Sequence, residues 1–133
     1  MRKWMFPFLF VGISVSSTVF AQDACNPNDI SQQAMNICAA ADYDAADAKL
    51  NKLYGELAEA AADEATLKLL RKSQRASLVF RDSECDYAAS DSLGGSIYPL
   101  LVSQCLTRLT EARIAQLKAD ANCEGGGDCD AGK

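Results

Sequence analysis

The chain has 133 residues, and from residue 22 onward it carries 11 basic and 18 acidic residues, a net charge of −7. This balance disfavours nucleic acid and anionic membranes as partners, because both require a cationic surface, and it suits a cationic protein. The sequence contains no histidine and no CxxC pair. We therefore expect neither a metal site nor another cofactor.

The first 21 residues differ from the rest and are expected to be a signal peptide. Arg2 and Lys3 precede an uncharged apolar run over residues 4–20, and small residues then allow cleavage after Ala21. A transmembrane anchor is disfavoured because the run is short and no basic stop-transfer cluster follows it. Lipidation at Cys25 is disfavoured because polar residues precede it. The expected location is periplasmic or secreted, with no stable membrane insertion after cleavage.

The remaining 112 residues are enough for one domain with a modest core. We place a helical domain at residues 22–122. Residues 123–133, CEGGGDCDAGK, form a glycine-rich tail that we expect to be flexible, except where its two cysteines tie it.

A first helix is predicted after the turn-like CNPND, with Ser31 as its N-cap. Alanine is abundant in this stretch and β-branched residues are nearly absent, which favours a helix. One row of residues recurs at three- and four-residue steps: Met35, Cys38, Asp42, Ala46, Leu50, Leu53, Leu57 and Ala61.

A second helix is predicted after the break ADEAT, residues 62–66, where Asp63 or Thr66 can cap it. Its core-facing row is Leu67, Leu70, Gln74, Leu78, Arg81 and Cys85, and half of this row from Gln74 to Cys85 is polar. An arginine on this row requires an explanation, because charged side chains are seldom buried without a partner.

SDSLGGS, residues 90–96, is the clearest loop of the chain. A third helix is predicted to follow from about Ile97, with Pro99 tolerated in its first turn. Its row is Val102, Leu106, Leu109, Arg113 and Leu117. Three helices with short connections predict an all-α, three-helix antiparallel bundle.

The antiparallel arrangement predicts which polar residues meet. Reflection about a turn centred near Glu64 places Asp47 opposite Arg81, Tyr54 opposite Gln74 and Tyr43 opposite Cys85. Asn51 shares the face of Asp47 and Tyr54. Reflection about the turn at Gly94 and Gly95 places Arg113 near residues 74–75.

Two interpretations of these polar residues are open. The first is an interior network in which a bidentate Arg81–Asp47 pair, flanked by Asn51, Gln74 and tyrosine hydroxyls, fixes helix register. The second is a catalytic site with Asp47 as acid or base. We favour the network and no catalytic residues, because an aspartate paired with arginine stays ionised and is a poor proton donor.

Carboxylates that lie close together on the first helix are interpreted as a solvated acidic face. They are Asp42 with Asp44 and Glu56 with Glu59.

The six cysteines, at positions 25, 38, 85, 105, 123 and 129, form an even set that is expected to pair in an oxidising compartment. Fifteen connectivities are possible, and the spacing alone does not choose among them.

Three segments together resemble the LprI-like lysozyme-inhibitor N-terminal family of small exported bacterial proteins. They are MNICAAADYDAADAKLNKLY, LRKSQRASLVFRDSEC and GGSIYPLLVSQCLTRLTEARIAQL, and the resemblance runs from about Cys25 to Leu117. The shared residues are Asn36, Cys38, Asp47, Leu50, Asn51, Tyr54, Gln74, Arg81, Asp82, Cys85, Gly94, Gly95, Ser96, Cys105, Thr110 and Arg113. One departure is Ser77, which stands where family members commonly carry tryptophan.

The family's four usual cysteines correspond to 25, 38, 85 and 105, which leaves 123 and 129 as an extra pair. Within that frame we favour Cys85–Cys105, which closes the hairpin around the glycine loop. Cys25–Cys38 would then pin the N-terminal arm onto the first helix, and Cys123–Cys129 would close the tail.

The resemblance implies an exported helical protein that inhibits lysozyme by protein–protein binding. A cationic lysozyme-type hydrolase is then the expected partner, and the loop at residues 90–96 is the candidate blocking element. The residues of this loop that we single out are Ser90, Asp91, Ser92, Gly94, Gly95 and Ser96. Two alternatives stay open: the loop is a plain helix connector, or the protein is a non-inhibitory module that binds another envelope protein.

Overall fold

The computed structural model describes residues 25–123, and three long α-helices account for most of this range. They are α1 (Gln32–Glu59), α2 (Glu64–Ala88) and α3 (Tyr98–Ala121), and a 3-10 helix, η2 (Ser90–Ser92), lies between the last two. No strand occurs in the described range, and none of its helices is long and apolar enough to cross a membrane. The all-α prediction is confirmed. The expected signal peptide and most of the tail lie outside the described residues.

The helices begin where local chemistry satisfies their first backbone N–H groups. Ser31 caps α1 by accepting a hydrogen bond from the Ala34 N–H at 3.2 Å. Of the two residues proposed to cap α2, Asp63 does so, accepting from the Thr66 N–H at 2.7 Å. α3 has its proline in the first turn, as predicted.

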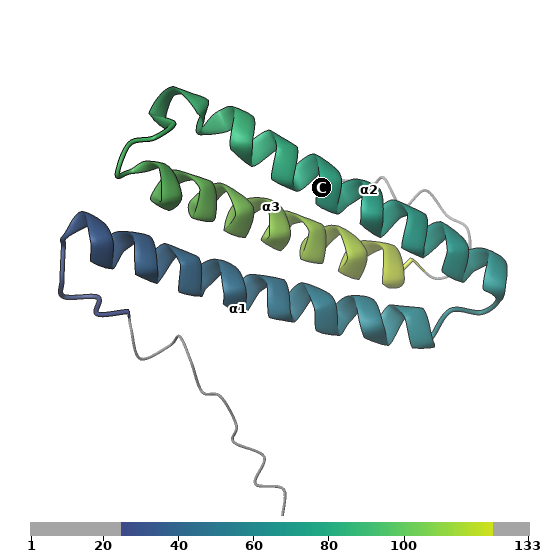
Figure 1. Ribbon diagram of the computed structural model, residues 1–133. Coiled ribbons are helices and arrows are strands. Elements are labelled where there is room, and N and C mark those ends of the chain that lie inside the picture. The colour runs from purple at the N-terminus through teal and green to yellow at the C-terminus, as the bar shows by residue number, and fades with distance from the viewer. Residues whose placement is uncertain (1–24, 124–133) are drawn as a thin grey trace, which may run out of the picture.

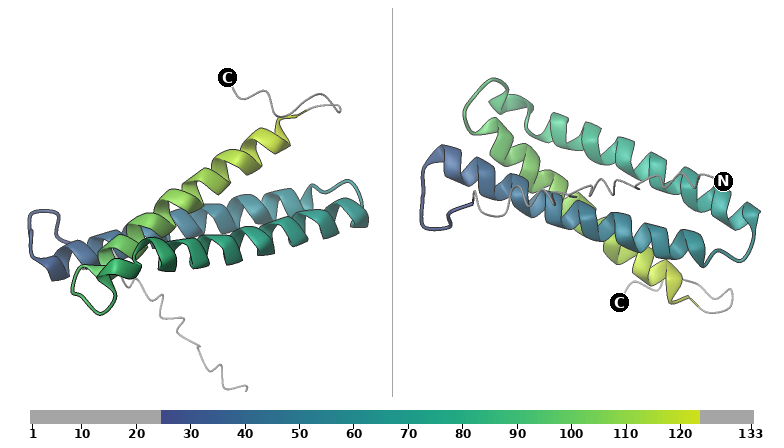
Figure 2. Two further views of the ribbon diagram at one scale, coloured as in Figure 1. Left: turned by 90° about the horizontal axis from the view of Figure 1, so that it is seen from above. Right: turned by 60° about the horizontal axis from the view of Figure 1, so that its bottom comes forward.

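The three helices run up, down and up, with α3 between the other two in Figure 1 and crossing them obliquely in Figure 2. α1 approaches α3 most closely, whereas α2 lies farther from both. The bundle was expected to be built from sequential antiparallel pairs. Its tightest contact is instead between α1 and α3, which run in the same direction.

Small side chains explain this close approach. The buried apolar residues are Ala34, Ala39, Ala46, Leu50, Cys85, Ala89, Cys105 and Leu117. Four polar residues are equally buried: Gln74, Arg81, Thr110 and Arg113. Because so little large apolar surface is buried, the fold depends on covalent links and polar contacts more than a Leu-rich bundle does.

Two disulfides hold the described residues at the end of the bundle where α1 begins. Cys85–Cys105 joins α2 to α3, with 5.5 Å between Cα atoms, and Cys25–Cys38 joins the N-terminal arm to α1 at 4.7 Å. Both are the pairs that we favoured. The third proposed pair, Cys123–Cys129, involves a residue outside the described range.

Candidate functional site

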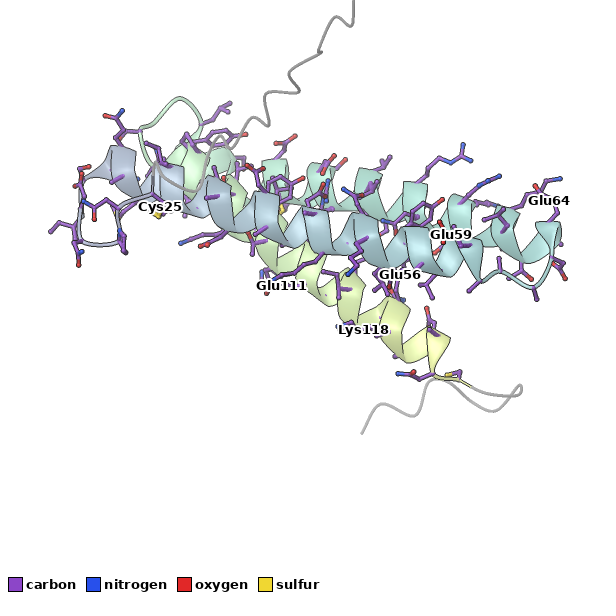
Figure 3. All side chains as sticks on the ribbon, turned by 90° about the horizontal axis from the view of Figure 1, so that it is seen from below. Cys25, Glu56, Glu59, Glu64, Glu111 and Lys118 are labelled. Atoms are coloured by element: carbon purple, nitrogen blue, oxygen red, sulfur yellow. A yellow bond between two sulfur atoms is a disulfide. The ribbon has the colours of Figure 1, made fainter. Side chains whose placement is uncertain are left out.

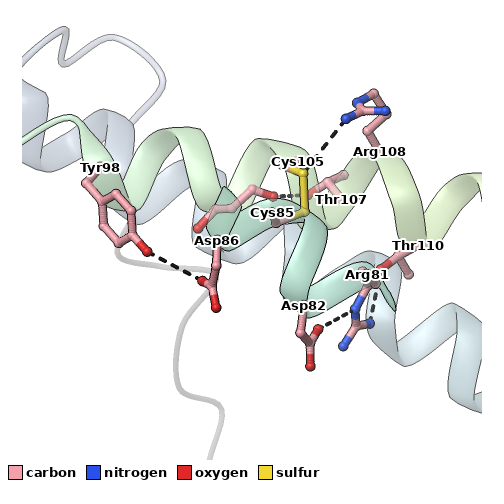
Figure 4. Close-up of a disulfide and its surroundings, with 10 residues drawn as sticks. Arg81, Asp82, Cys85, Asp86, Tyr98, Cys105, Thr107, Arg108 and Thr110 are labelled. Atoms are coloured by element: carbon pink, nitrogen blue, oxygen red, sulfur yellow. Dashed lines mark hydrogen bonds and ion pairs between the residues drawn. A yellow bond between two sulfur atoms is a disulfide. The ribbon is translucent and has the colours of Figure 1, made fainter. Parts of the chain in front are cut away.

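Arg81 lies inside the bundle and contacts all three helices. Figure 4 shows its bonds to Asp82 on α2 and to Thr110 on α3. Its Nη1 donates to Oδ1 of Asp47 on α1 at 2.9 Å and to the hydroxyl of Thr110 on α3 at 3.2 Å. Its Nε donates to Oδ1 of Asp82 at 2.8 Å. The guanidinium also lies 5.3 Å from the ring centre of Tyr43, within range of a cation–π interaction. A single arginine therefore connects α1, α2 and α3.

The Arg81–Asp47 contact is present but is not bidentate, because Nε of the guanidinium pairs with Asp82 instead. The second oxygen of Asp47 accepts from Asn51 Nδ2 at 2.9 Å. The Asp47 side chain is 32% exposed, so its charge is only partly removed from water. This exposure lowers the cost of losing its partner.

Arg113 forms a second polar cluster between α3 and α2. Its Nε donates to Gln74 Oε1 at 3.1 Å, and Nη2 donates to the Ser73 hydroxyl at 2.9 Å. Nη1 donates to Gln116 Oε1 at 2.7 Å. The Tyr54 hydroxyl, which was expected opposite Gln74, makes no hydrogen bond to any residue in the described range. The predicted single network is thus two separate clusters.

The sequence-based network omitted Thr110, Asp82, Ser73 and Gln116. Thr110 and Gln116 each lie three residues from Arg113, so helical spacing was the signal that could have found them. Asp82 is adjacent in sequence to Arg81. Among the described residues, every buried side-chain nitrogen and oxygen has a hydrogen-bond partner.

These clusters are suited to holding helices together. Burial opposes the charged form of Arg81, but hydrogen bonds to Asp82 and Asp47 outweigh it and raise the pKa of the guanidinium further. Arg81 is therefore a permanent cation. Burial raises the pKa of the Tyr43 hydroxyl, against the opposing effect of Arg81. The described residues contain no group of three or more metal-ligating side chains.

The loop at residues 90–96 is built from consecutive tight turns. The N–H groups of Ser92, Leu93 and Gly95 donate to the carbonyls of residues 89, 90 and 92. Gly94 has φ of 78°, a left-handed conformation that favours glycine, and a side chain at Gly95 would press on the Ser92 carbonyl. The two glycines therefore permit the turn.

Two neighbours hold this loop in place. Asn36 Nδ2 on α1 donates to the Ser96 carbonyl at 3.0 Å, and the Cys85–Cys105 disulfide joins the helices on either side. Leu93 is nevertheless 74% exposed, and Ser90, Asp91 and the two glycines are also exposed. The loop is therefore an ordered projection with an apolar side chain near its tip.

A shallow groove of about 340 Å³ at the opposite end of the bundle was not predicted from the sequence. It lies where α3 diverges from the other helices (Figure 2), with Arg113 in its lining. Its apolar residues are Leu57, Ala61, Leu69, Leu70, Leu117 and Ala121.

Fold and geometry define a small helical protein stapled by disulfides, with interior arginines and an ordered exposed loop. Residues 23–117 match the family described as "Lysozyme inhibitor LprI", and the chain belongs to this family. It is similar to the uncharacterized protein R02472 of Rhizobium meliloti, at 44% identity over 101 residues covering 67% of this chain and 73% of the relative. It is also similar to the uncharacterized protein YecT of Escherichia coli, at 30% identity, covering 90% and 94% of the two chains. No solved structure gives a significant match.

Proposed function

We propose that this protein is an exported inhibitor of lysozyme-type cell-wall hydrolases that acts by binding the enzyme. The observation that carries the proposal is the match of residues 23–117 to a family described as a lysozyme inhibitor. Export to the periplasm or the medium is supported by the predicted signal peptide. It is also supported by the two disulfides, which persist in oxidising compartments.

The acidic surface supports a cationic partner. Exposed carboxylates occur on all three helices, including Glu56 and Glu59 on α1, Glu64 on α2 and Glu111 on α3 (Figure 3). The pairs expected to form a solvated acidic face are all exposed. Such a surface steers a cationic enzyme toward the inhibitor, which raises the association rate and makes it sensitive to salt.

The loop at residues 90–96 is the part of the surface best suited to enter an active-site cleft. Its turns are already hydrogen-bonded and its base is anchored at both sides, so little conformational entropy is lost on binding. The N–H groups of Gly94 and Ser96 make no backbone hydrogen bond within residues 25–123, and Ser90 is exposed. These donors complement the paired carboxylates of a glycosidase cleft.

Leu93 adds an apolar anchor at the same place. An exposed leucine beside unpaired N–H donors offers both apolar contact and hydrogen bonds to a cleft lined by polar and aromatic groups. The helices on either side bring no comparable combination to one short segment. We therefore assign the inhibitory contact to this loop.

The proposal is tested by titrating the oxidised protein, residues 22–133, into lysozymes of several structural types while lysis of cell walls is followed. At least one lysozyme should be inhibited at micromolar protein. Absence of inhibition across the panel would refute the proposal and favour a non-inhibitory envelope module.

Variants then locate the contact. Replacing Ser90 by alanine and Leu93 by serine should weaken inhibition without lowering thermal stability, whereas Gln104→Ala, at an exposed uncharged residue on α3, should leave inhibition unchanged. Equal inhibition by parent and loop variant would remove the loop from the contact. Loss of inhibition together with stability would indicate that the loop is a structural connector.

A further inference from the structure

The outer face of α2 carries large apolar side chains that stay exposed, and one of them, Leu69, also borders the groove between α2 and α3. Leu69, Val79, Phe80 and Tyr87 are each between 60% and 77% exposed. α2 buries only three of its residues, and two of those are polar. No large apolar side chain of α2 is therefore fully buried in the bundle.

Most of these residues lie on one row along the helix. Steps of four and three residues connect Leu69, Ser73, Ala76, Phe80, Ser83 and Tyr87. We name this row the apolar stripe. Its residues are all exposed, although the Ser73 hydroxyl also accepts a hydrogen bond from Arg113 of α3. The apolar stripe extends over 19 residues, or about 27 Å of helix. Its spacing is the one by which two helices pack along a common seam.

The apolar stripe reads symmetrically about Leu78, a residue of the inward-facing row. If a second α2 lay against it in the opposite direction, Leu69 would meet Tyr87, Ser73 would meet Ser83, and Ala76 would meet Phe80. Phe80, the largest side chain near the centre, would thus lie against Ala76 of the second copy, and Ser73 would face Ser83. This complementarity in size suits packing of one α2 on another.

The neighbouring row carries charges that are complementary in an antiparallel pair. Each of its residues directly precedes a residue of the apolar stripe in the sequence, and we name it the charged row. It consists of Lys68, Lys72, Arg75, Val79, Asp82 and Asp86. Cations occupy its first three positions and carboxylates its last two. In the same antiparallel pairing, Lys68 would face Ala88 of the second copy and Lys72 would face Glu84. Asp86 and Asp82 of that copy would each lie two residues, or about 3 Å of helix rise, from these positions, within reach of the lysine side chains.

We propose that two copies of this protein associate through α2, antiparallel, with the apolar stripe at the centre and the charged rows at the side. The four large exposed side chains offer on the order of 500 Å² per copy, so the pair would bury roughly 1,000 Å². That area is at the lower limit for a specific interface, so dissociation constants in the micromolar range are expected. The inference does not depend on the proposed inhibition of lysozyme.

Sedimentation equilibrium of the oxidised protein from about 5 to about 500 µM tests the proposal over the range expected for such an interface. The parent should show a monomer–dimer equilibrium. Phe80→Ser should raise the dissociation constant at least about tenfold. Leu93→Ser removes an exposed apolar residue that lies outside α2 and should leave the dissociation constant unchanged. A strictly monomeric parent, or equal effects of the two substitutions, would overturn the proposal.

Charge variants test the antiparallel orientation. Lys68→Glu with Lys72→Glu leaves Arg75 as the one cation of the charged row. Asp82→Asn with Asp86→Lys makes it basic without placing a new cation beside Arg81. Each variant alone should dimerise less than the parent, and an equimolar mixture should form a heterodimer.

A mixture that stays monomeric while the parent dimerises would overturn the antiparallel pairing. Circular dichroism should show that each variant melts at the temperature of the parent, and a destabilised variant would be replaced by its single substitution Lys72→Glu or Asp86→Lys.

If the parent is monomeric and Phe80→Ser instead weakens lysozyme binding, the apolar stripe belongs to the hydrolase interface. That result would overturn self-association and leave the proposed function intact.

Discussion

Replacement of Arg81 by alanine tests how much the interior polar contacts stabilise the bundle. The bond to Asp47 contributes about 1.5 kcal/mol, because Asp47 is one-third exposed and keeps Asn51 as a partner. Leaving the fully buried Thr110 hydroxyl without this donor costs roughly 1 kcal/mol. Loss of the stack on Tyr43 and of the packed side-chain stem costs about 0.5–1 kcal/mol. The bond to Asp82 adds little, because that carboxylate is 60% exposed.

Arg81→Ala should therefore lower the free energy of unfolding by about 3 kcal/mol in urea titrations followed by circular dichroism at low protein concentration. Arg75→Ala, on the same helix but exposed and without a hydrogen bond in the described structure, should cost less than about 0.5 kcal/mol. Arg81→Met should be more stable than Arg81→Ala only by the packing of its side-chain stem, because it restores none of the hydrogen bonds. If the free energy of unfolding of Arg81→Ala lies within about 0.5 kcal/mol of the parent's, the interior role assigned to this arginine is wrong.

Three further predictions concern other parts of the fold. Removing the α2–α3 disulfide by changing Cys85 and Cys105 to serine should cost about 3 kcal/mol in the same assay, given a closed loop of 20 residues, and an unchanged midpoint would contradict its role. Gly94→Ala should cost about 1 kcal/mol because φ is positive there, and a neutral effect would mean that the loop relaxes. The hydrogen bond from the Thr66 backbone lowers the pKa of the Asp63 cap below 3.8, so its stabilisation is present above pH 3.8 and is lost as pH falls through the lowered value. Asp63→Asn keeps a capping oxygen that does not titrate. The urea midpoint of the parent should thus fall more than that of Asp63→Asn between pH 5 and pH 2.5. Parallel pH profiles would show that the Asp63 carboxylate is not the source of this pH dependence.

Helix positions were predictable because local chemistry determines them. Ser31, Asp63 and Pro99 mark helix starts whatever the rest of the chain does. The contact between Arg81 and Asp47 was predictable because antiparallel helices rise equally from their shared turn. The placement of Arg113 near Gln74 follows from the same geometry.

Contacts that depend on helix spacing were not predictable in this way. Reflection about the turn assumes that α1 and α2 are each other's closest neighbours. In the structure α3 approaches α1 most closely, because small buried side chains such as Ala39 and Ala46 allow a short distance between these helices. Only a long side chain, such as that of Arg81, crosses the wider gap to α2. Tyr54 therefore does not meet Gln74, and Thr110 of α3 enters the contact instead.

The most direct test of the central claim is calorimetric titration of the oxidised protein into a lysozyme that it inhibits, with and without an oligosaccharide filling the catalytic cleft. If the loop at residues 90–96 enters that cleft, the free enzyme should bind one chain, and the oligosaccharide should abolish the heat of binding. Binding that is equally strong with the cleft filled would contradict the account.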